Sequence, residues 1–205
     1  MTNNYFMKKL FACLFLIGTT GLASAQMSNF TGLSVGGNIE FKSTTLKLSS
    51  SGTEFSGLGS QNLIGSISAD YGIEIGKSSV LLVGGKFDLQ DTNIVEVTSS
   101  GTTVKLDESN HYSLFVAPGI LLNDKTLGYV KLSYESSKAT SNISSTIEVG
   151  TITGMGYGAG IRTHLSGNWF ANIEAARIVY STKSIDSISY STGTTIGMFG
   201  LSYKF

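Results

Sequence analysis

The chain has 205 residues, and its 14 lysines and arginines are balanced by 14 aspartates and glutamates. This balance leaves no basic surface of the kind that binds nucleic acid, and a single cysteine, Cys13, excludes a disulfide scaffold or a thiolate metal site. The 25 glycines and one proline, with abundant serine and threonine, favour β-structure that has small side chains on one crowded face.

Residues 1–25 contain the three parts of a secretory signal peptide. Two lysines precede a short apolar stretch, which is followed by an Ala-Ser-Ala cleavage site. The apolar stretch is shorter than the roughly 20 residues that a membrane-spanning helix needs. We therefore expect cleavage after Ala25 and one mature domain of residues 26–205; a retained signal anchor is the alternative.

Eight segments of the mature chain alternate with a period of two between large apolar and small or polar side chains. In the first of them, Leu33, Val35 and Ile39 share one face, and serine, glycine and asparagine share the other. This is the pattern of β-strands with one apolar face. The predicted strands are residues 30–42, 61–75, 80–90, 110–122, 127–135, 154–165, 169–180 and 192–205. Eight is an allowed number for a closed membrane barrel.

The connections between the predicted strands alternate in length. Three are tight turns, at 76–79, 123–126 and 166–168, and four are long and rich in serine, threonine and glycine, at 43–60, 91–109, 136–153 and 181–191. Short periplasmic turns and longer extracellular loops are typical of outer-membrane barrels. In the second long connection Val95, Val97, Val104 and Leu106 alternate, which predicts that this strand pair continues above the membrane.

Most charged side chains of the predicted strands lie on the face opposite the large apolar residues. A charge that faces lipid near the membrane midplane costs about 2–4 kcal/mol, so we expect the apolar face to meet lipid and the charged face to line the lumen. A soluble eight-stranded barrel would instead bury its apolar face inside. The expected lumen charges are Glu40, Asp70, Glu74, Lys86, Asp88, Lys131, Arg162, Glu174 and Lys204.

The width of an eight-stranded barrel limits what the lumen can do. Its interior is just wide enough to be filled by side chains, so we expect the charges to bridge across it. A general porin is thereby excluded, and a low-conductance or gated channel for small solutes is the alternative function.

Aromatic residues gather near the ends of the predicted strands, as expected for girdles at the two membrane interfaces. The last strand carries an alternating pattern of Phe199, Leu201, Tyr203 and Phe205 on one face. The expected girdle residues are Phe30, Phe41, Tyr112, Tyr134, Trp169, Tyr180, Tyr203 and Phe205.

The signal sequence, the eight strands, the tight turns and the pattern Phe199-x-Leu201-x-Tyr203-x-Phe205 resemble the small eight-stranded outer-membrane β-barrels of Gram-negative bacteria. That group includes the OmpA transmembrane domain, OmpX-like proteins and opacity-type surface proteins, and residues 115–129 are similar to the fourth and fifth strands of the opacity-like group. The resemblance implies an eight-stranded antiparallel up-and-down transmembrane β-barrel in the bacterial outer membrane.

The same resemblance implies partners and a role. The terminal pattern would be recognised by the barrel-assembly machinery, and the apolar face would contact outer-membrane lipid and lipopolysaccharide. We expect a monomer without a cofactor. Its role would be structural or one of surface interaction, in which the four extracellular loops contact host surfaces or phage.

His111 and Ser113 have a spacing that resembles the lipid A deacylases, which are also eight-stranded outer-membrane barrels. The residue after the serine is Leu114, where those enzymes have asparagine, and the strand alternation directs both side chains inward, away from lipid. We therefore expect no enzymatic activity.

His164 is expected to form hydrogen bonds in the lumen, and two histidines without a cluster at ligand spacing indicate no metal site. The glycine-rich segment 154–160 lacks the lysine and helix of a phosphate loop.

Overall fold

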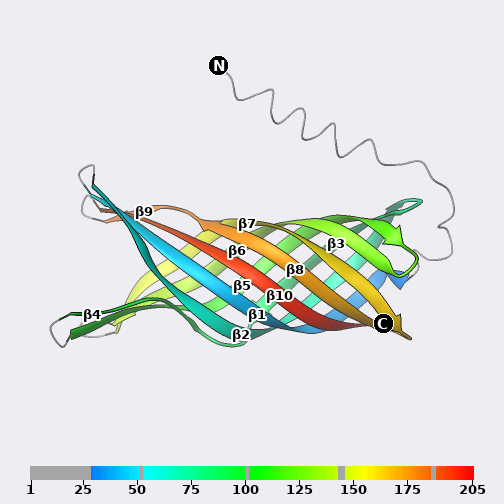
Figure 1. Cartoon of the computed structure of the whole chain (residues 1–205), viewed down its shortest axis with the longest axis horizontal. Helices are drawn as coiled ribbons and strands as arrows, with labels where there is room; N and C mark the ends of the chain where they lie inside the picture. Colours follow the sequence, from blue (N-terminus) through cyan, green and yellow to red (C-terminus); the bar gives the residue numbers. More distant parts are fainter. Residues whose placement is uncertain (1–28, 51–52, 100–101, 143–145, 186–187) are drawn as a thin grey trace, which may run out of the picture.

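The computed structural model describes residues 29–50, 53–99, 102–142, 146–185 and 188–205, which form a closed antiparallel β-barrel (Figure 1). The expected signal peptide, residues 1–25, lies outside the described residues. Within the described part of the chain, no helix has the length and apolarity to cross a membrane.

Among the described residues, ten strands form one sheet that closes on itself where β1 pairs with β10. β4 continues the line of β3 along β5, and β9 continues the line of β8 along β10. The wall of the barrel therefore has eight positions around the ring, as the sequence predicts. The strands are β1 (Gly32–Ser50), β2 (Thr53–Gly76), β3 (Ser79–Asp88), β4 (Thr92–Ser99), β5 (Thr102–Asn123), β6 (Thr126–Asn142), β7 (Thr146–Ser166), β8 (Trp169–Tyr180), β9 (Lys183–Ile185) and β10 (Ile188–Lys204).

The strands are much longer at one end than the sequence predicts. β1 and β2 stay paired as far as Ser50 and Thr53, and β6 and β7 as far as Asn142 and Thr146. Most described residues of the four predicted loops are therefore strand. Serine and threonine are common in loops, but threonine also fits a pleated sheet. A composition rich in these residues therefore could not distinguish a loop from a paired strand. The predicted continuation of the second hairpin is confirmed, because Val97 pairs with Val104 in β4 and β5.

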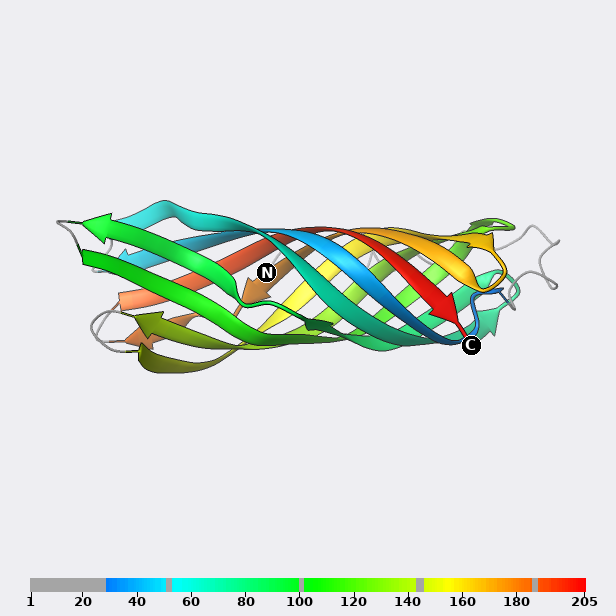
Figure 2. The ribbon, with the colours of Figure 1, turned by 90° about the horizontal axis from the view of Figure 1, so that it is seen from below.

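The two ends of the barrel differ. The C-terminus lies at the end opposite the β4–β5 hairpin (Figures 1 and 2). We call the end with the long hairpins the outer end and the end with the C-terminus the turn end, since the tight turns that join β2 to β3, β5 to β6 and β7 to β8 lie there.

Large apolar side chains point outward in a belt around the barrel, as the alternation predicts. The exposed fraction of the side chains in this apolar belt runs from 40% for Val83 to 71% for Phe205. The belt includes Leu33, Val35, Ile39, Phe41, Ile67, Tyr71, Ile73, Val83, Phe87, Leu114, Val116, Val130, Leu132, Ile161, Ile173, Phe199 and Leu201.

Two of the expected girdle aromatics point inward instead. Phe30 is 3% exposed because its ring packs on Phe170 inside the turn end, with 5.5 Å between the centroids. Tyr180 shares the inner face of β8 with Ile178, two residues earlier, and is 4% exposed. The prediction was wrong for both, since position near a strand end does not decide which face a side chain takes.

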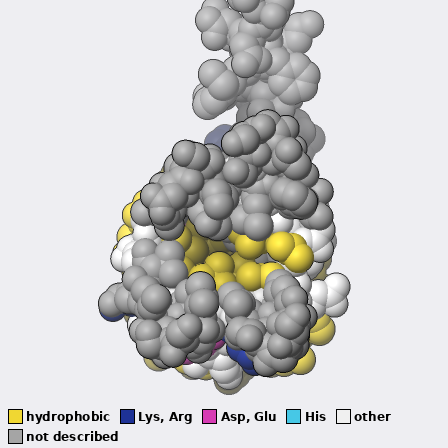
Figure 3. Space-filling view, turned by 90° about the vertical axis from the view of Figure 1, so that its left-hand side faces the viewer, with side chains coloured by type: hydrophobic (Ala, Val, Ile, Leu, Met, Phe, Trp, Pro, Cys, Tyr) yellow, Lys and Arg dark blue, Asp and Glu magenta, His cyan; other side chains and the backbone are white. Residues whose placement is uncertain are grey.

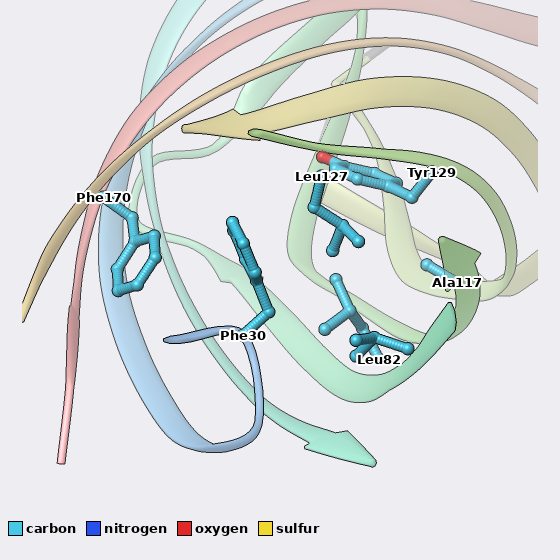
Figure 4. Packing of buried hydrophobic residues seen from close by; sticks show 7 residues of the cluster. Phe30, Leu82, Ala117, Leu127, Tyr129 and Phe170 are labelled. Atoms are coloured by element: carbon cyan, nitrogen blue, oxygen red, sulfur yellow. The ribbon is translucent and has the colours of Figure 1, made fainter. Parts of the chain in front are cut away.

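An apolar cluster closes the lumen at the turn end. Figure 4 shows the packed side chains, which come from the segment before β1 and from β3, β5, β6 and β8. Burial of each large aliphatic or aromatic side chain contributes about 1.5–3 kcal/mol. The cluster is formed by Phe30, Val80, Leu82, Ala117, Leu127, Tyr129 and Phe170.

Candidate functional site

Beyond the apolar cluster, the middle of the lumen is filled by buried charged side chains, here called the lumen charge network. Seven of the nine expected residues lie in it, each at most 8% exposed: Glu40, Asp70, Lys86, Asp88, Lys131, Arg162 and Glu174. Glu74 keeps the inward register, since it pairs with the buried Val80, but it is exposed because it lies at the turn end of β2, two residues before the strand ends. Lys204 is half-buried at the end of β10.

Arg162 of β7 crosses the lumen to Asp70 of β2. Its two terminal nitrogens donate to the two carboxylate oxygens at 2.8 and 2.6 Å, and Nε donates to Asn172 Oδ1 at 2.8 Å. Asn172 in turn donates to Ser202 Oγ at 3.0 Å. This paired geometry satisfies both charges and joins β2, β7, β8 and β10 across the barrel.

Lys131 of β6 pairs with Glu174 of β8, which also accepts a hydrogen bond from the Tyr129 hydroxyl at 3.0 Å. The ammonium group lies 5.3 Å from the centre of the Phe115 ring, within the range of a cation–π contact. The Tyr129 side chain thus connects the apolar cluster to the charges above it.

Nearer the outer end, Lys86 donates to both oxygens of Glu40, at 2.7 and 2.6 Å, and its nitrogen lies 3.6 Å from Asp88 Oδ1. Ser66 donates to the same Glu40 carboxylate. Glu40 is fully buried, so these donors supply the compensation that a buried carboxylate requires.

A second group adjoins it around His111. Lys42 pairs with Asp88, and His111 Nδ1 lies 2.7 Å from the same carboxylate. On the other side of the ring, His111 Nε2 lies 3.1 Å from Glu135 Oε2. The imidazole therefore lies between two carboxylates, one from β3 and one from β6.

Three charged residues of the lumen were missed by the sequence analysis: Lys42, Glu108 and Glu135. Lys42 and Glu135 lie at the last positions of predicted strands and keep the inward alternation of Glu40 and Lys131, so that signal could have found them. Glu108 could not be found in this way, because a register shift between Ser109 and Tyr112 changes the alternation of β5.

His111 and Ser113, whose spacing resembles that of the lipid A deacylases, do not lie on the outward apolar face of the barrel. His111 and Ser113 are 3% and 1% exposed, and the Ser113 hydroxyl donates to Glu135 Oε1 at 3.1 Å. Both side chains point inward, as the alternation predicts.

Within the described residues, no group of three or more histidine, cysteine, aspartate or glutamate side chains is arranged to hold a metal ion. His164 lies at the turn end, where its Nε2 is 2.7 Å from the Gly167 carbonyl oxygen.

Little free space is left in the middle of the lumen. A cavity of about 30 Å³ lies among Asp70, Lys86, Lys131, Arg162 and Glu174, which is room for roughly one or two water molecules. The network is therefore an interior filled largely by paired side chains, with a small polar pocket among them.

The outer part of the lumen is more apolar. Ile178, Tyr180 and Ile196 pack together there, and Figure 3, which faces this end, shows apolar side chains within the mouth of the barrel. The Tyr180 hydroxyl donates to Glu108 at 2.7 Å, and the other oxygen of that carboxylate accepts from Thr92 at 3.0 Å.

The expected assembly residues lie on the outer face beside the closing seam. Phe199, Leu201 and Phe205 are 48%, 45% and 71% exposed. Tyr203 is half-buried because its ring meets Trp169 and Phe205 edge to face, with 5.2 Å between centroids in each pair.

Comparison with known proteins identifies a family. A model of the outer membrane protein beta-barrel domain matches residues 11–205. No curated protein matches the chain by sequence.

Solved structures with the same architecture include neisserial surface protein A, which is 14% identical over 85% of this chain and 98% of its own, with a TM-score of 0.54. This likeness shows the fold. OprG from Pseudomonas aeruginosa is 11% identical over 85% of this chain and 96% of its own, with a TM-score of 0.49. Ail, the attachment invasion locus protein of Yersinia pestis, is 16% identical over 85% of this chain and 100% of its own, with a TM-score of 0.47.

Proposed function

The chain belongs to the family of outer-membrane β-barrel domains, and from this premise we propose that it is a plugged, non-enzymatic barrel whose outer hairpins interact with other surfaces. Membership of the family implies the bacterial outer membrane. The proposal concerns what the barrel does there.

The observation that carries the proposal is the length of the paired strands beyond the apolar belt. Phe41 is the last large apolar residue on the outer face of β1, yet β1 and β2 remain paired from Ser43 and Gln61 to Ser50 and Thr53. Residues 43–50 rise about 26 Å along the strand, at ~3.3 Å per residue. Their outward positions include Ser43, Thr45 and Lys47, so this ribbon suits water and a cell-surface partner.

The lumen supports the rest of the proposal. Ion pairs bridge it at Arg162–Asp70, Lys131–Glu174 and Lys86–Glu40, which stiffens the barrel as a platform for the hairpins. His111 and Ser113 are enclosed by this network rather than directed at a lipid substrate, which supports a role without catalysis.

The test is a whole-cell attachment assay with trimmed hairpins. Each outer hairpin is shortened at a paired position, such as Thr45 and Gly59 of β1 and β2 or Ala139 and Gly150 of β6 and β7, and closed with an Asn-Gly turn. Bacteria that otherwise do not adhere express either the full or the trimmed barrel, and attachment to immobilised host cells and phage adsorption are counted.

We expect the full barrel to confer attachment or adsorption and the variant with all four hairpins trimmed to lose it. Replacing Lys77-Ser78 in a turn-end connection by Asn-Gly is the matched control, since that turn lies at the opposite end of the barrel. Undiminished binding by a correctly folded, fully trimmed barrel would refute the role of the hairpins.

The remaining expectations about the protein's partners are part of the same proposal. We infer cleavage of the signal peptide after Ala25, insertion by the assembly machinery through Phe199, Leu201, Tyr203 and Phe205, and a monomer in contact with lipid and lipopolysaccharide. The exposed apolar belt supports contact with lipid, and the outward terminal aromatics support recognition by the assembly machinery. The cleavage site rests on the sequence of residues 1–25.

A further inference from the structure

In the described part of the chain, the wall of the barrel is interrupted near the outer end between β7 and β9. Pairing between β7 and β8 stops at Gly154 and Tyr180, and the last backbone hydrogen bond across this seam joins Ser181 N to Thr153 O at 2.8 Å. Above it, the outer part of β7 pairs with β6 and β9 pairs with β10. In the described part of the chain, no pairing joins β7 to β9.

A groove lies at the base of this seam, on the outer surface of the barrel. Its volume is about 370 Å³, within the range of ~300–1,000 Å³ that is usual for ligand sites. Tyr134, Met155 and Val179 form its apolar surface, and Thr153 and Ser181 supply polar groups. The three apolar side chains are 43%, 59% and 49% exposed.

These side chains form one row across neighbouring strands, and the row ends in a cation. Tyr134 pairs with Met155, Met155 with Val179, and Val179 with Gly193. The guanidinium of Arg177 lies over Gly193, since a Cβ added there would be 2.6 Å from Arg177 Nη2. Its Nη1 donates to Thr195 Oγ1 at 2.7 Å, which holds the group beside the row and leaves other donors for a ligand.

The groove is closed toward the lumen. Ile178 and Ile196 are 1% and 4% exposed and pack behind it with Tyr180. On the outer side it continues into the apolar belt, where Tyr157, the register neighbour of Arg177, is 56% exposed. A ligand therefore reaches the groove from the lipid side.

We propose that this groove is a binding site for a phosphorylated glycolipid of the outer leaflet, with one acyl chain along Tyr134, Met155 and Val179 and a phosphate on Arg177. Because the groove is continuous with the apolar belt, a membrane lipid can enter it from the side. The guanidinium of Arg177 matches the geometry and charge of a phosphate group. The site is independent of the hairpin role proposed above.

The test is native mass spectrometry of the purified barrel, released from a neutral detergent, with bisphosphorylated lipid A as the probe. We expect one retained lipid A per barrel, and about tenfold weaker retention, equal to ~1.4 kcal/mol, for Arg177→Ala or for lipid A without its phosphates. Val179→Trp, which fills the groove, is expected to have a similar effect. Ile173→Trp on the same outward face of β8 is its control.

Gly193→Ala separates position from charge, because the new methyl group displaces the guanidinium while Arg177 remains. Its matched control is Gly197→Ala on the same strand, where a Cβ meets nothing within 4 Å. We expect Gly193→Ala to retain less lipid A than the wild type, and Gly197→Ala to retain as much as the wild type. Heat-dependent gel mobility confirms that each variant is folded.

Equal retention by wild type and Arg177→Ala, or of lipid A with and without phosphates, would overturn the proposal. Saturable laurate binding that depends on Arg177 and excludes lipid A would also overturn it, since it would assign the groove to a free fatty acid.

Discussion

Replacement of Arg162 by alanine tests the lumen charge network directly. Arg162 makes both hydrogen bonds to the Asp70 carboxylate, at 2.8 and 2.6 Å, and Asp70 is 5% exposed. Removing one partner of a buried ion pair leaves the other charge uncompensated and costs about 3–5 kcal/mol. Arg162→Ala should therefore lower the free energy of unfolding by that amount, and Arg162→Ala with Asp70→Ala should lower it by less.

The measurement is urea unfolding of the barrel in lipid vesicles, followed by tryptophan fluorescence from Trp169. The control is Lys105→Ala in the exposed pair Lys105–Glu96, whose side chains are 44% and 48% exposed; we expect a loss of about 0–1 kcal/mol there. The reasoning fails if Arg162→Ala is as stable as the Lys105 variant, or if removing Asp70 as well makes the loss larger.

Three further predictions concern the packing of the barrel, its conductance and the processing of the chain. Gly72→Ala should destabilise the barrel by at least ~1–3 kcal/mol in the same urea assay, because its Cβ would lie 2.0 Å from the Phe30 carbonyl oxygen; a stability equal to that of Gly197→Ala would contradict this. Planar-bilayer recordings should show no wide, steady pore for the wild type, and a small conductance when Arg162 and Lys131 are both alanine; a porin-sized wild-type conductance would refute the plug. Intact-mass measurement of the outer-membrane form should give a chain that begins at Gln26, and a chain that retains residues 1–25 would exclude the proposed cleavage.

Period-two alternation predicted the fold because the two faces of each strand have opposite requirements. Ile39 and Ile67 lie on the outward apolar belt. Glu40 and Asp70 lie inside the lumen, where each forms an ion pair with a residue of another strand. A slip of one residue would exchange the two faces, so the pattern is strongly constrained in the middle of the barrel and identified seven lumen charges.

The alternation failed where the ladder is irregular or where the belt ends. The register shift before Tyr112 changed the face of nearby residues, so Glu108 lies inside. Glu74 keeps the inward register, because it pairs with the buried Val80, but it is exposed at the turn end of β2. Above the belt, the outward positions of the β1–β2 ribbon are polar, so the contrast between an apolar outer face and a polar inner face is lost, and Ser43 or Thr45 could not be assigned to a strand from the sequence. The groove beside Arg177 was also beyond sequence analysis, since it depends on register across four strands.

The most direct test of the closed barrel is the gel mobility of the outer-membrane fraction, with and without boiling in detergent. A closed barrel with a bridged lumen should resist the detergent unboiled and migrate faster than the boiled, unfolded chain. A protein that is soluble in the periplasm, and whose mobility does not depend on boiling, would contradict the assignment of the apolar face to lipid and of the charges to the lumen.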